Sequence, residues 1–243
     1  MKDSLGDEMK RLEAETTLEP FTFDKPIYAR VDGRAFHTLT KRIKSSEETQ
    51  SGFLEGFTIS MMAGMKEVME DLHADVAYVQ SDEASFGWFP KENELSQHPF
   101  DGKVMKLNSV IASAFTGNFL FAMLHYYGPW RYGKLSFDCR MVDVKNTTNL
   151  QRMFYWRYLD ARRNAISMFA RQHWSQRELN GVKTASILEK IDANDNVKAE
   201  WGHLDRCYKE GLFFIRGHER AVTREQFIAE FERKKDATPL PKD

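Results

Sequence analysis

Two short acidic stretches contain the residue types needed to bind a metal ion and a nucleotide. The first is Asp32-Gly33, which directly follows an apolar run, and the second is Ser81-Asp82-Glu83. Carboxylates and backbone carbonyls are ligands that Mg²⁺ prefers, and a glycine lets the backbone approach closely. Metal ions held in this way activate an attacking oxygen and neutralise a leaving pyrophosphate. Asp-Gly is also a common turn dipeptide, so the chemical interpretation requires that the two stretches meet in the fold.

The spacing of apolar residues predicts elements that would bring these stretches together. Residues 27–31 are typical of a strand, and residues 50–72 have the apolar spacing of an amphipathic helix. Two β-prone runs between residues 76 and 89, joined by a short polar link, predict a hairpin. In a strand–helix–strand crossover the two strands run parallel, so their carboxyl ends emerge at the same edge of the sheet. We therefore expect Asp32 and Asp82 to lie side by side at that edge.

Further elements follow from the same patterns and define a fold class. They are a short helix through Leu5, Met9 and Leu12, a helix over 104–124, a strand over 135–144, a long helix over 150–174 and a strand over 212–215. This order predicts an α+β fold of the ferredoxin-like or polymerase-palm kind, with helices packed on an antiparallel sheet. We expect residues 1–235 to form a single catalytic domain with helical additions, and residues 236–243 to form a flexible tail.

The composition narrows the class of protein. Hydrophobic residues make up 42% of the 243, which excludes wholesale disorder. Two cysteines are too few for a disulfide framework, which fits a reducing cytoplasm. No apolar run approaches the ~20 residues needed to cross a bilayer, and the N-terminus is too polar for a secretory signal, so we expect a cytoplasmic protein without a membrane partner.

Charge predicts that any contact with nucleic acid is local. The 35 Lys and Arg residues are balanced by 36 Asp and Glu residues, whereas a protein that coats long duplexes is usually more basic. The densest basic region lies in the long helix predicted over 150–174 and just beyond it; it consists of Arg152, Arg157, Arg162, Arg163, Arg171 and Arg177. These arginines are either a solvated helix face or a site for an RNA backbone, which requires cations. Phe154 and Tyr158 are expected to pack inward.

The acidic stretches also carry a family resemblance. RVDGRAFHTLT at 30–40 and YVQSDEASFGW at 78–88 closely resemble the tRNA-His guanylyltransferase family, in particular its guanylyltransferase-like branch. FDCR at 137–140 is similar to that family too. The resemblance implies a magnesium-dependent nucleotidyltransferase that adds nucleotides in the 3′-to-5′ direction to tRNA. Its implied partners are the 5′ end and acceptor stem of tRNA and the substrates ATP and GTP, and it implies a homo-oligomer, commonly a tetramer.

The resemblance implies roles for particular residues. Metal coordination, by two ions, falls to Asp32, the carbonyl of Gly33, and Asp82, and a supporting role falls to Glu83. The residues implied to surround the nucleotide triphosphate are Asp32, Gly33, Arg34, Ala35, Phe36, His37, Lys44, Ser81 and Asp82.

Two lysines align with a further motif of the family. Lys103 and Lys106 fall where the family has an Arg/Lys triphosphate clamp, although the surrounding sequence departs from the usual basic motif there. Trp156, Arg157 and Asp160 also fit a family-like pattern, in which each has either a functional or a structural role.

One departure from the family bears on the substrate. Members dedicated to tRNA-His carry His-Ile-Asn-Asn-Leu-Tyr-Asn in the long helix, whereas residues 162–168 here are Arg-Arg-Asn-Ala-Ile-Ser-Met. Loss of that run implies template-dependent repair of shortened tRNA 5′ ends, with Arg162, Arg163 and Asn164 as candidates for RNA contact. Three alternatives remain open: a dedicated tRNA-His guanylyltransferase, a nucleotide cyclase that uses similar carboxylates without RNA, and a non-catalytic RNA-binding protein.

Overall fold

The computed structural model describes residues 9, 18–44, 52–92, 97–128 and 135–233. Its centre is an antiparallel five-stranded sheet with the strand order β4-β1-β3-β2-β5. The strands are β1 (Ile27–Gly33), β2 (Val76–Gln80), β3 (Glu83–Trp88), β4 (Phe137–Asp143) and β5 (Leu212–Ile215).

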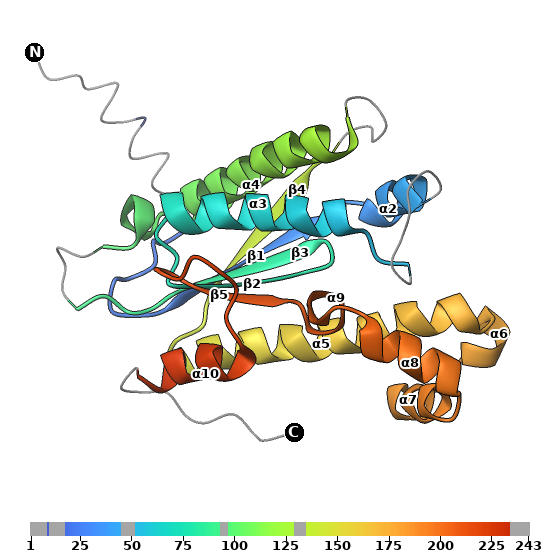
Figure 1. The fold of residues 1–243 in the computed structure, drawn as a ribbon. Helices are drawn as coiled ribbons and strands as arrows, with labels where there is room; N and C mark the ends of the chain where they lie inside the picture. The colour runs from blue at the N-terminus through green and yellow to red at the C-terminus, as the bar shows by residue number, and fades with distance from the viewer. Residues whose placement is uncertain (1–8, 10–17, 45–51, 93–96, 129–134, 234–243) are drawn as a thin grey trace, which may run out of the picture.

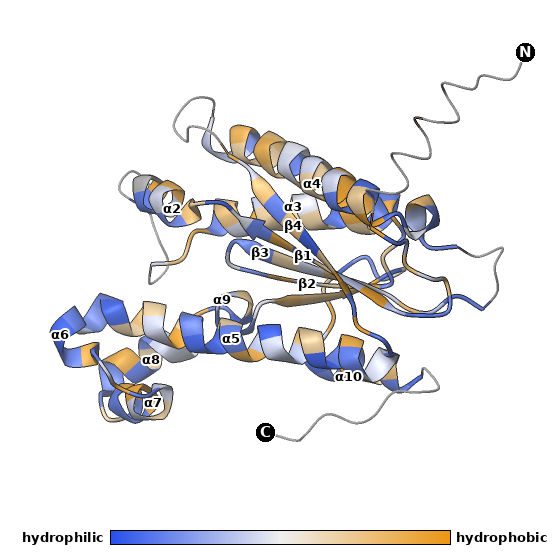
Figure 2. Cartoon of the chain, turned by 180° about the vertical axis from the view of Figure 1, so that it is seen from behind, coloured by the Kyte–Doolittle hydropathy of each residue, from blue (hydrophilic) through white to orange (hydrophobic). Residues whose placement is uncertain are grey.

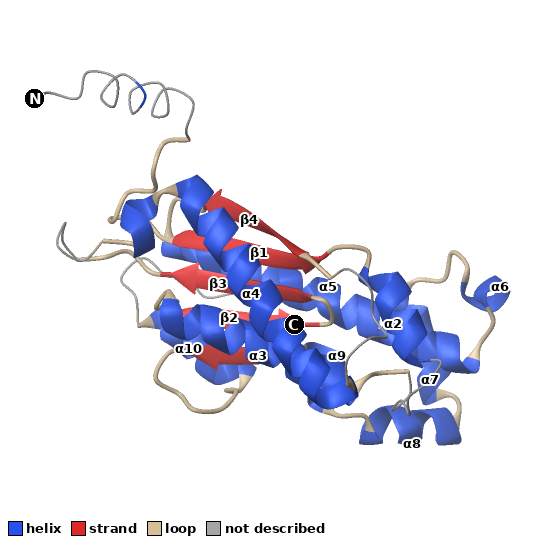
Figure 3. Cartoon of the chain, turned by 90° about the horizontal axis from the view of Figure 1, so that it is seen from above, coloured by secondary structure: helices blue, strands red, loops and turns tan. Residues whose placement is uncertain are grey.

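Helices cover both faces of this sheet. Between β1 and β2 lie α2 (Phe36–Lys44) and α3 (Glu55–Asp71), and α4 (Val104–Tyr127) lies between β3 and β4. Figure 3 shows α3 and α4 crossing over the strands, and Figure 1 shows α5 (Thr147–His173) and α10 (Arg224–Glu232) on the opposite face. The order from β1 to β4 is the β-α-β-β-α-β pattern of ferredoxin-like folds, so the predicted α+β class is confirmed.

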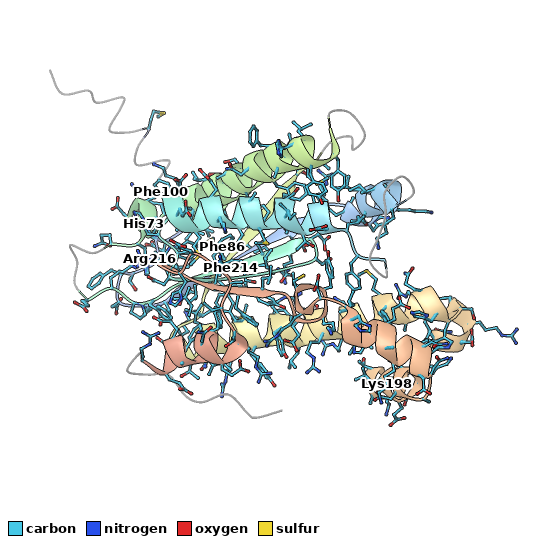
Figure 4. All side chains as sticks on the ribbon, viewed as in Figure 1. His73, Phe86, Phe100, Lys198, Phe214 and Arg216 are labelled. Carbon is cyan, nitrogen blue, oxygen red and sulfur yellow. The ribbon has the colours of Figure 1, made fainter. Side chains whose placement is uncertain are left out.

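The alternation of side chains along β1 explains why both faces are covered. Ile27, Ala29 and Val31 are buried with α3 and α4, whereas Tyr28 points to the other face and packs with α5. Phe86 and Phe214 lie in the first of these layers (Figure 4). The second layer buries two residues of α5 that were predicted to pack inward, Phe154 and Tyr158.

The last part of α5 belongs to a third hydrophobic cluster. Short helices pack against it there: α6 (Gln176–Leu179), α7 (Thr184–Asp192), α8 (Asp195–His203) and α9 (Arg206–Glu210). A short 3-10 helix, η1 (Pro99–Gly102), precedes α4.

The short helices from α6 onward and α2 were not predicted, and α3 begins at Glu55 rather than at residue 50. The predicted tail and, apart from Met9, the predicted N-terminal helix lie outside the described residues.

Helix α4 is longer and more apolar than the sequence analysis allowed. By length and composition alone it could cross a membrane, so the prediction that no such segment exists is wrong. One stripe of α4 is fully buried in the core against the sheet and α3; it consists of Leu107, Ile111, Phe115, Phe119 and Met123. The opposite side remains apolar, with Phe121 75% exposed, as the orange segments of α4 in Figure 2 indicate. A cytoplasmic location stays a prediction.

Replacing Phe36 with alanine should destabilise the fold by about 3–5 kcal/mol, because a large buried side chain leaves a cavity. The Phe36 ring lies 4.7 Å from that of Phe137 and 5.6 Å from that of Phe119, between centroids. Urea unfolding measures the loss, and Thr38→Ala, at an exposed position of the same helix, should change stability by less than about 0.5 kcal/mol. Equal losses for the two variants would show that Phe36 does not anchor α2.

Candidate active site

The two acidic stretches meet at one edge of the sheet. Both β1 and β2 run antiparallel to β3, which lies between them, so their carboxyl ends point the same way. The backbone N–H of Gly33 donates a hydrogen bond of 2.9 Å to the carbonyl oxygen of Asp82. Asp32 lies directly opposite Glu83 in the ladder of β1 and β3. The predicted proximity of Asp32 and Asp82 is therefore confirmed.

Backbone strain marks both segments at this edge. Only Ser81 and Asp82 link the paired residues Gln80 and Glu83, and Ser81 has a φ of 50°. Ala35, two residues after Gly33, has a φ of 57°. Non-glycine residues in the left-handed region cost about 1–3 kcal/mol and are concentrated at functional sites. The strain supports a functional role for the turn that carries Asp82 and the loop that follows Asp32.

Glycine at position 33 is required by the close approach of Phe36. A Cβ atom on Gly33 would lie 2.6 Å from the Phe36 ring, which is itself only 2% exposed. The buried ring cannot line a triphosphate, so the predicted contact of Phe36 is limited to its backbone. Arg34, Ala35 and His37 are exposed around it. Because α2 begins at Phe36, its first N–H groups have no partner within the helix and favour an anion at this edge.

Ionisation of the carboxylates at this edge is unfavourable in the folded protein. Burial raises the pKa of Asp82, and the charge of Asp32 raises it further. A divalent cation between the two would relieve this repulsion, and Asp32, Asp82 and the carbonyl of Gly33 are the hard oxygen donors that Mg²⁺ prefers. No cluster of three or more His, Cys, Asp or Glu side chains is placed to hold a metal in the described part of the chain. The donor set thus fits an ion that takes its remaining ligands from water and substrate phosphates, as Mg²⁺ does.

Glu83 is held by arginines instead. The Nε atom of Arg157, on α5, lies 2.6 Å from Glu83 Oε1, and the Nε atom of Arg30 lies 3.8 Å from Oε2. The Glu83 and Arg157 side chains are 14% and 13% exposed, so this ion pair is largely shielded from water. Burial raises the pKa of Glu83, and the hydrogen bond from Arg157 opposes that shift. Arg157 also binds Asp160 at 2.9 Å, so Glu83 is fixed to α5, which fits a supporting role.

A cavity of about 130 Å³ lies beside the turn, and its lining includes Lys44, Ser81, Asn164 and Met168. The Lys44 ammonium is half-buried, and its Nζ atom lies 3.8 Å from the Met168 sulfur. Burial lowers the pKa of Lys44. No carboxylate pairs with Lys44 among the described residues, so it is suited to an incoming phosphate. Lys44, Ser81 and Asn164 are thus brought together, although the sequence placed Asn164 with the RNA-contacting residues.

The two lysines at the place of the predicted triphosphate clamp do not lie at this edge of the sheet. Lys103 and Lys106 lie at the start of α4, at the end of the sheet opposite the Ser81–Asp82 turn, where Figure 4 labels Phe100. The Nζ atom of Lys106 lies 4.6 Å from the centroid of the Phe100 ring. Helix α4 has 24 residues and is therefore roughly 36 Å long. Within one chain the structure therefore does not bring these lysines to the edge that carries Asp32 and Asp82, and their role as a triphosphate clamp stays a prediction.

The two adjacent arginines of α5 also diverge. Arg163 is exposed and binds Asp160 at 2.7 Å, whereas Arg162 lies over the Tyr158 ring on another side of the helix. A single RNA-binding surface formed by both is therefore not supported.

Sequence reasoning missed Asp138 and Arg140 as site residues. On β4, Asp138 lies directly opposite Asp32, and Arg140 lies directly opposite Arg30. Opposite residues in an antiparallel pair share a face, with roughly 5 Å between Cβ atoms, so Asp138 adds a third acid near Asp32. FDCR marked this strand as similar to a family, but the register that aligns Asp138 with Asp32 cannot be read from the sequence.

The fold and the edge carboxylates fit a class of enzyme in which metal ions assist nucleotidyl transfer. The chain is a nucleotidyltransferase, and its particular kind follows from a family model. The model described as tRNAHis guanylyltransferase matches residues 6–145, more than half of the chain. The chain therefore belongs to the tRNAHis guanylyltransferase family.

Known relatives agree with this assignment. The tRNA(His) guanylyltransferase of Schizosaccharomyces pombe is 26% identical over 232 residues, which cover 89% of this chain and 82% of the relative. A bacterial tRNA(His) guanylyltransferase (Thg1)-like protein in complex with ATP has a TM-score of 0.78 at 26% identity, and the match covers 93% of this chain and 95% of that one. The Saccharomyces cerevisiae enzyme, at 19% identity, has a TM-score of 0.74 over 92% of this chain and 98% of its own, and supports the fold.

Asp82→Asn should abolish nucleotide addition and yet raise the melting temperature of the metal-free protein at pH 7. Because the folded-state pKa of Asp82 is raised, its ionised form destabilises the fold, and this cost is relieved as the pH falls through that pKa. Each kcal/mol of relief raises the melting temperature by about 2–4 °C. The gain should shrink toward acidic pH, and the Glu219→Gln variant, at an exposed acid outside any helix, should show none. A lower melting temperature for Asp82→Asn would contradict this account of the site.

Arg157→Met should cost about 3–5 kcal/mol of stability, because it leaves the Glu83 carboxylate buried without its nearest partner. The double variant Arg157→Met/Glu83→Gln should recover part of that loss, because the buried carboxylate is then neutral and only Arg30 loses its ion-pair partner. Denaturant unfolding of the four proteins gives the coupling energy as a double-mutant cycle. Additive losses would mean that the pair does not act as a unit.

Proposed function

We propose that this protein repairs shortened 5′ ends of tRNA by adding nucleotides in the 3′-to-5′ direction, with the opposite strand as template. Family membership establishes the coarser activity, the addition of nucleotides to tRNA. The observation that carries the finer proposal is the replacement of the tRNA-His-associated run at residues 162–168. The edge carboxylates, by contrast, remain together.

The environment of the replaced run supports this proposal. Ala165, where dedicated members have an asparagine, is buried against the short helices that follow α5 and carries no hydrogen-bonding side chain. Met168, in place of another asparagine, presents only a thioether to Lys44. Without those amides the protein has fewer means of recognising one particular tRNA. Base pairing can then supply the discrimination, since a paired nucleotide presents its 3′-hydroxyl in line with the activated phosphate.

The residues at the edge suit both steps of such a reaction. An oxygen of the tRNA 5′-monophosphate attacks the α-phosphate of ATP and releases pyrophosphate. The 3′-hydroxyl of the incoming nucleotide then attacks the activated 5′-phosphate and releases AMP. Asp32, Asp82 and the Gly33 carbonyl would hold Mg²⁺, as two ions, which stabilises charge on the reacting phosphates. Lys44, half-buried and without an anionic partner among the described residues, neutralises a triphosphate.

Two of the alternatives are less well supported. Membership of a tRNA-modifying family argues against a nucleotide cyclase. A non-catalytic RNA-binding protein would have no need of the buried, mutually repelling pair formed by Asp32 and Asp82. The dedicated tRNA-His guanylyltransferase is the alternative that the experiment below must separate.

Self-association, including a tetramer, is part of the proposal. The apolar outer side of α4 supports it, because large exposed apolar patches mark interaction surfaces. The exposed apolar residues that lie together on that side are Leu120, Phe121 and Leu124, near the C-terminal end of the helix.

The nucleotide added should follow the complement of the template base. The substrate is a tRNA that lacks its first 5′ nucleotide, with an activated 5′ end, and the facing acceptor-stem base is varied through all four identities. Each nucleotide is offered singly with Mg²⁺, and the extended product is resolved on a sequencing gel. Addition should stop when the stem is complete.

The control is Asp32→Asn, which should add no nucleotide to any of the four substrates. Addition of G opposite every base, and to tRNA-His alone, would assign the chain to the dedicated guanylyltransferases. Failure of the wild-type protein to extend any tRNA would refute the repair function.

A further inference from the structure

An exposed tryptophan on α5 lies next to the site. Trp156 is 47% exposed, although tryptophan is among the costliest side chains to leave in water. The Arg157 guanidinium lies over its ring, with Cζ 4.6 Å from the centroid. Exposed arginines flank it on the same helix, Arg152 one turn before and Arg163 about two turns after. An aromatic ring among cations is the composition of a surface that stacks nucleobases beside a phosphate backbone.

The tryptophan is supported by a rigid neighbour. Arg157 has little freedom, because the same guanidinium binds Glu83 at 2.6 Å and Asp160 at 2.9 Å. A cation fixed in this way limits the orientations open to the adjacent indole. Stacking on a ring that is already oriented costs less conformational entropy than stacking on a mobile one.

Trp156 lies close to the carboxylates at the edge of the sheet. A single guanidinium separates its ring from Glu83, the residue directly opposite Asp32 in the sheet. On the same face, β4 contributes Asp138 and Arg140, and both are exposed rather than covered by α5. This half of the face is therefore polar and accessible, with Trp156 at its flank and the edge carboxylates at its end.

We propose that Trp156 is a stacking platform for a nucleobase at the end of the acceptor stem and thereby sets the position of the tRNA 5′ end relative to Asp32 and Asp82. The inference rests on the proposed function and adds a positioning residue to it. A base in the template strand, opposite the missing 5′ nucleotide, is the occupant: it has no base-pairing partner until the nucleotide arrives. Every base has a π-face, so this platform holds the template without choosing its sequence.

Trp156→Ala should weaken binding of 5′-truncated tRNA by roughly 5- to 150-fold, the range for loss of one base–aromatic stack. The slope of affinity against salt should stay as in the wild type, since stacking releases no counterions. Arg163→Ala should instead reduce that slope if Arg163 contacts phosphate. Trp156→Phe, which keeps a ring, should restore most of the affinity, and Ile59→Ala, at an exposed apolar residue of α3 on the opposite layer, should bind as the wild type does.

A fluorescent base reports the contact directly. With 2-aminopurine at the template position, the wild-type protein and Trp156→Phe should quench its emission on binding, and Trp156→Ala should not. Unchanged affinity and unchanged quenching in a folded Trp156→Ala protein overturn the inference while the wild-type protein still extends tRNA. A wild-type protein that neither binds nor extends tRNA would overturn the proposed function and the inference together.

Discussion

The hydrogen bond from the Gly33 N–H to the Asp82 carbonyl is the constraint on which the site depends. It joins the end of β1 to the turn between β2 and β3 and holds Asp32 and Asp82 at one edge. The bond requires that Gly33 carry no side chain, because the Phe36 ring occupies that space. Phe36 in turn packs on Phe119 and Phe137, so the aromatic core beneath the sheet determines the position of the carboxylates.

The acids at this edge differ in whether neighbouring cations neutralise their charge. Arg157 and Arg30 neutralise Glu83, whereas the pKa of Asp82 is raised by burial and by its neighbour Asp32. A fold selected for stability alone would pair or remove such an acid, since an uncompensated buried charge is costly. No cation pairs with Asp82 among the described residues, and a divalent cation would relieve the repulsion from Asp32, so the electrostatic cost of the free site and the metal binding that we propose would have one cause.

The sequence predicted the parts of this structure that follow from periodicity. Strand alternation around Tyr28 and the long apolar stripes of α3, α4 and α5 are local signals, and the crossover rule then placed Asp32 beside Asp82. Strand register is not a local signal, so Asp138 was missed although it lies opposite Asp32. Helix α2 was missed although Phe36, Leu39 and Ile43 have the spacing of a buried helical stripe, because its nine residues are fewer than the window over which such a pattern is usually assessed. Lys103 was assigned by family resemblance at a place where the sequence departs from the family motif, and a resemblance of that kind does not fix where the residue lies in the fold.

In the repair function that we propose, helix α5 carries both a contact to the active edge and the run of residues that would change the substrate. Its first half is fixed to the sheet through Phe154 and Tyr158, and Arg157 then contacts Glu83 at the active edge. The following turns, at residues 162–168, leave the sheet, line the cavity beside Lys44 and pack on the short helices. Substitutions in those turns alter what surrounds the RNA without moving Asp32 or Asp82, because the bonds that hold these acids lie within the sheet. In the proposed repair function, substrate choice would therefore depend on the second half of α5, whereas the sheet holds the edge carboxylates.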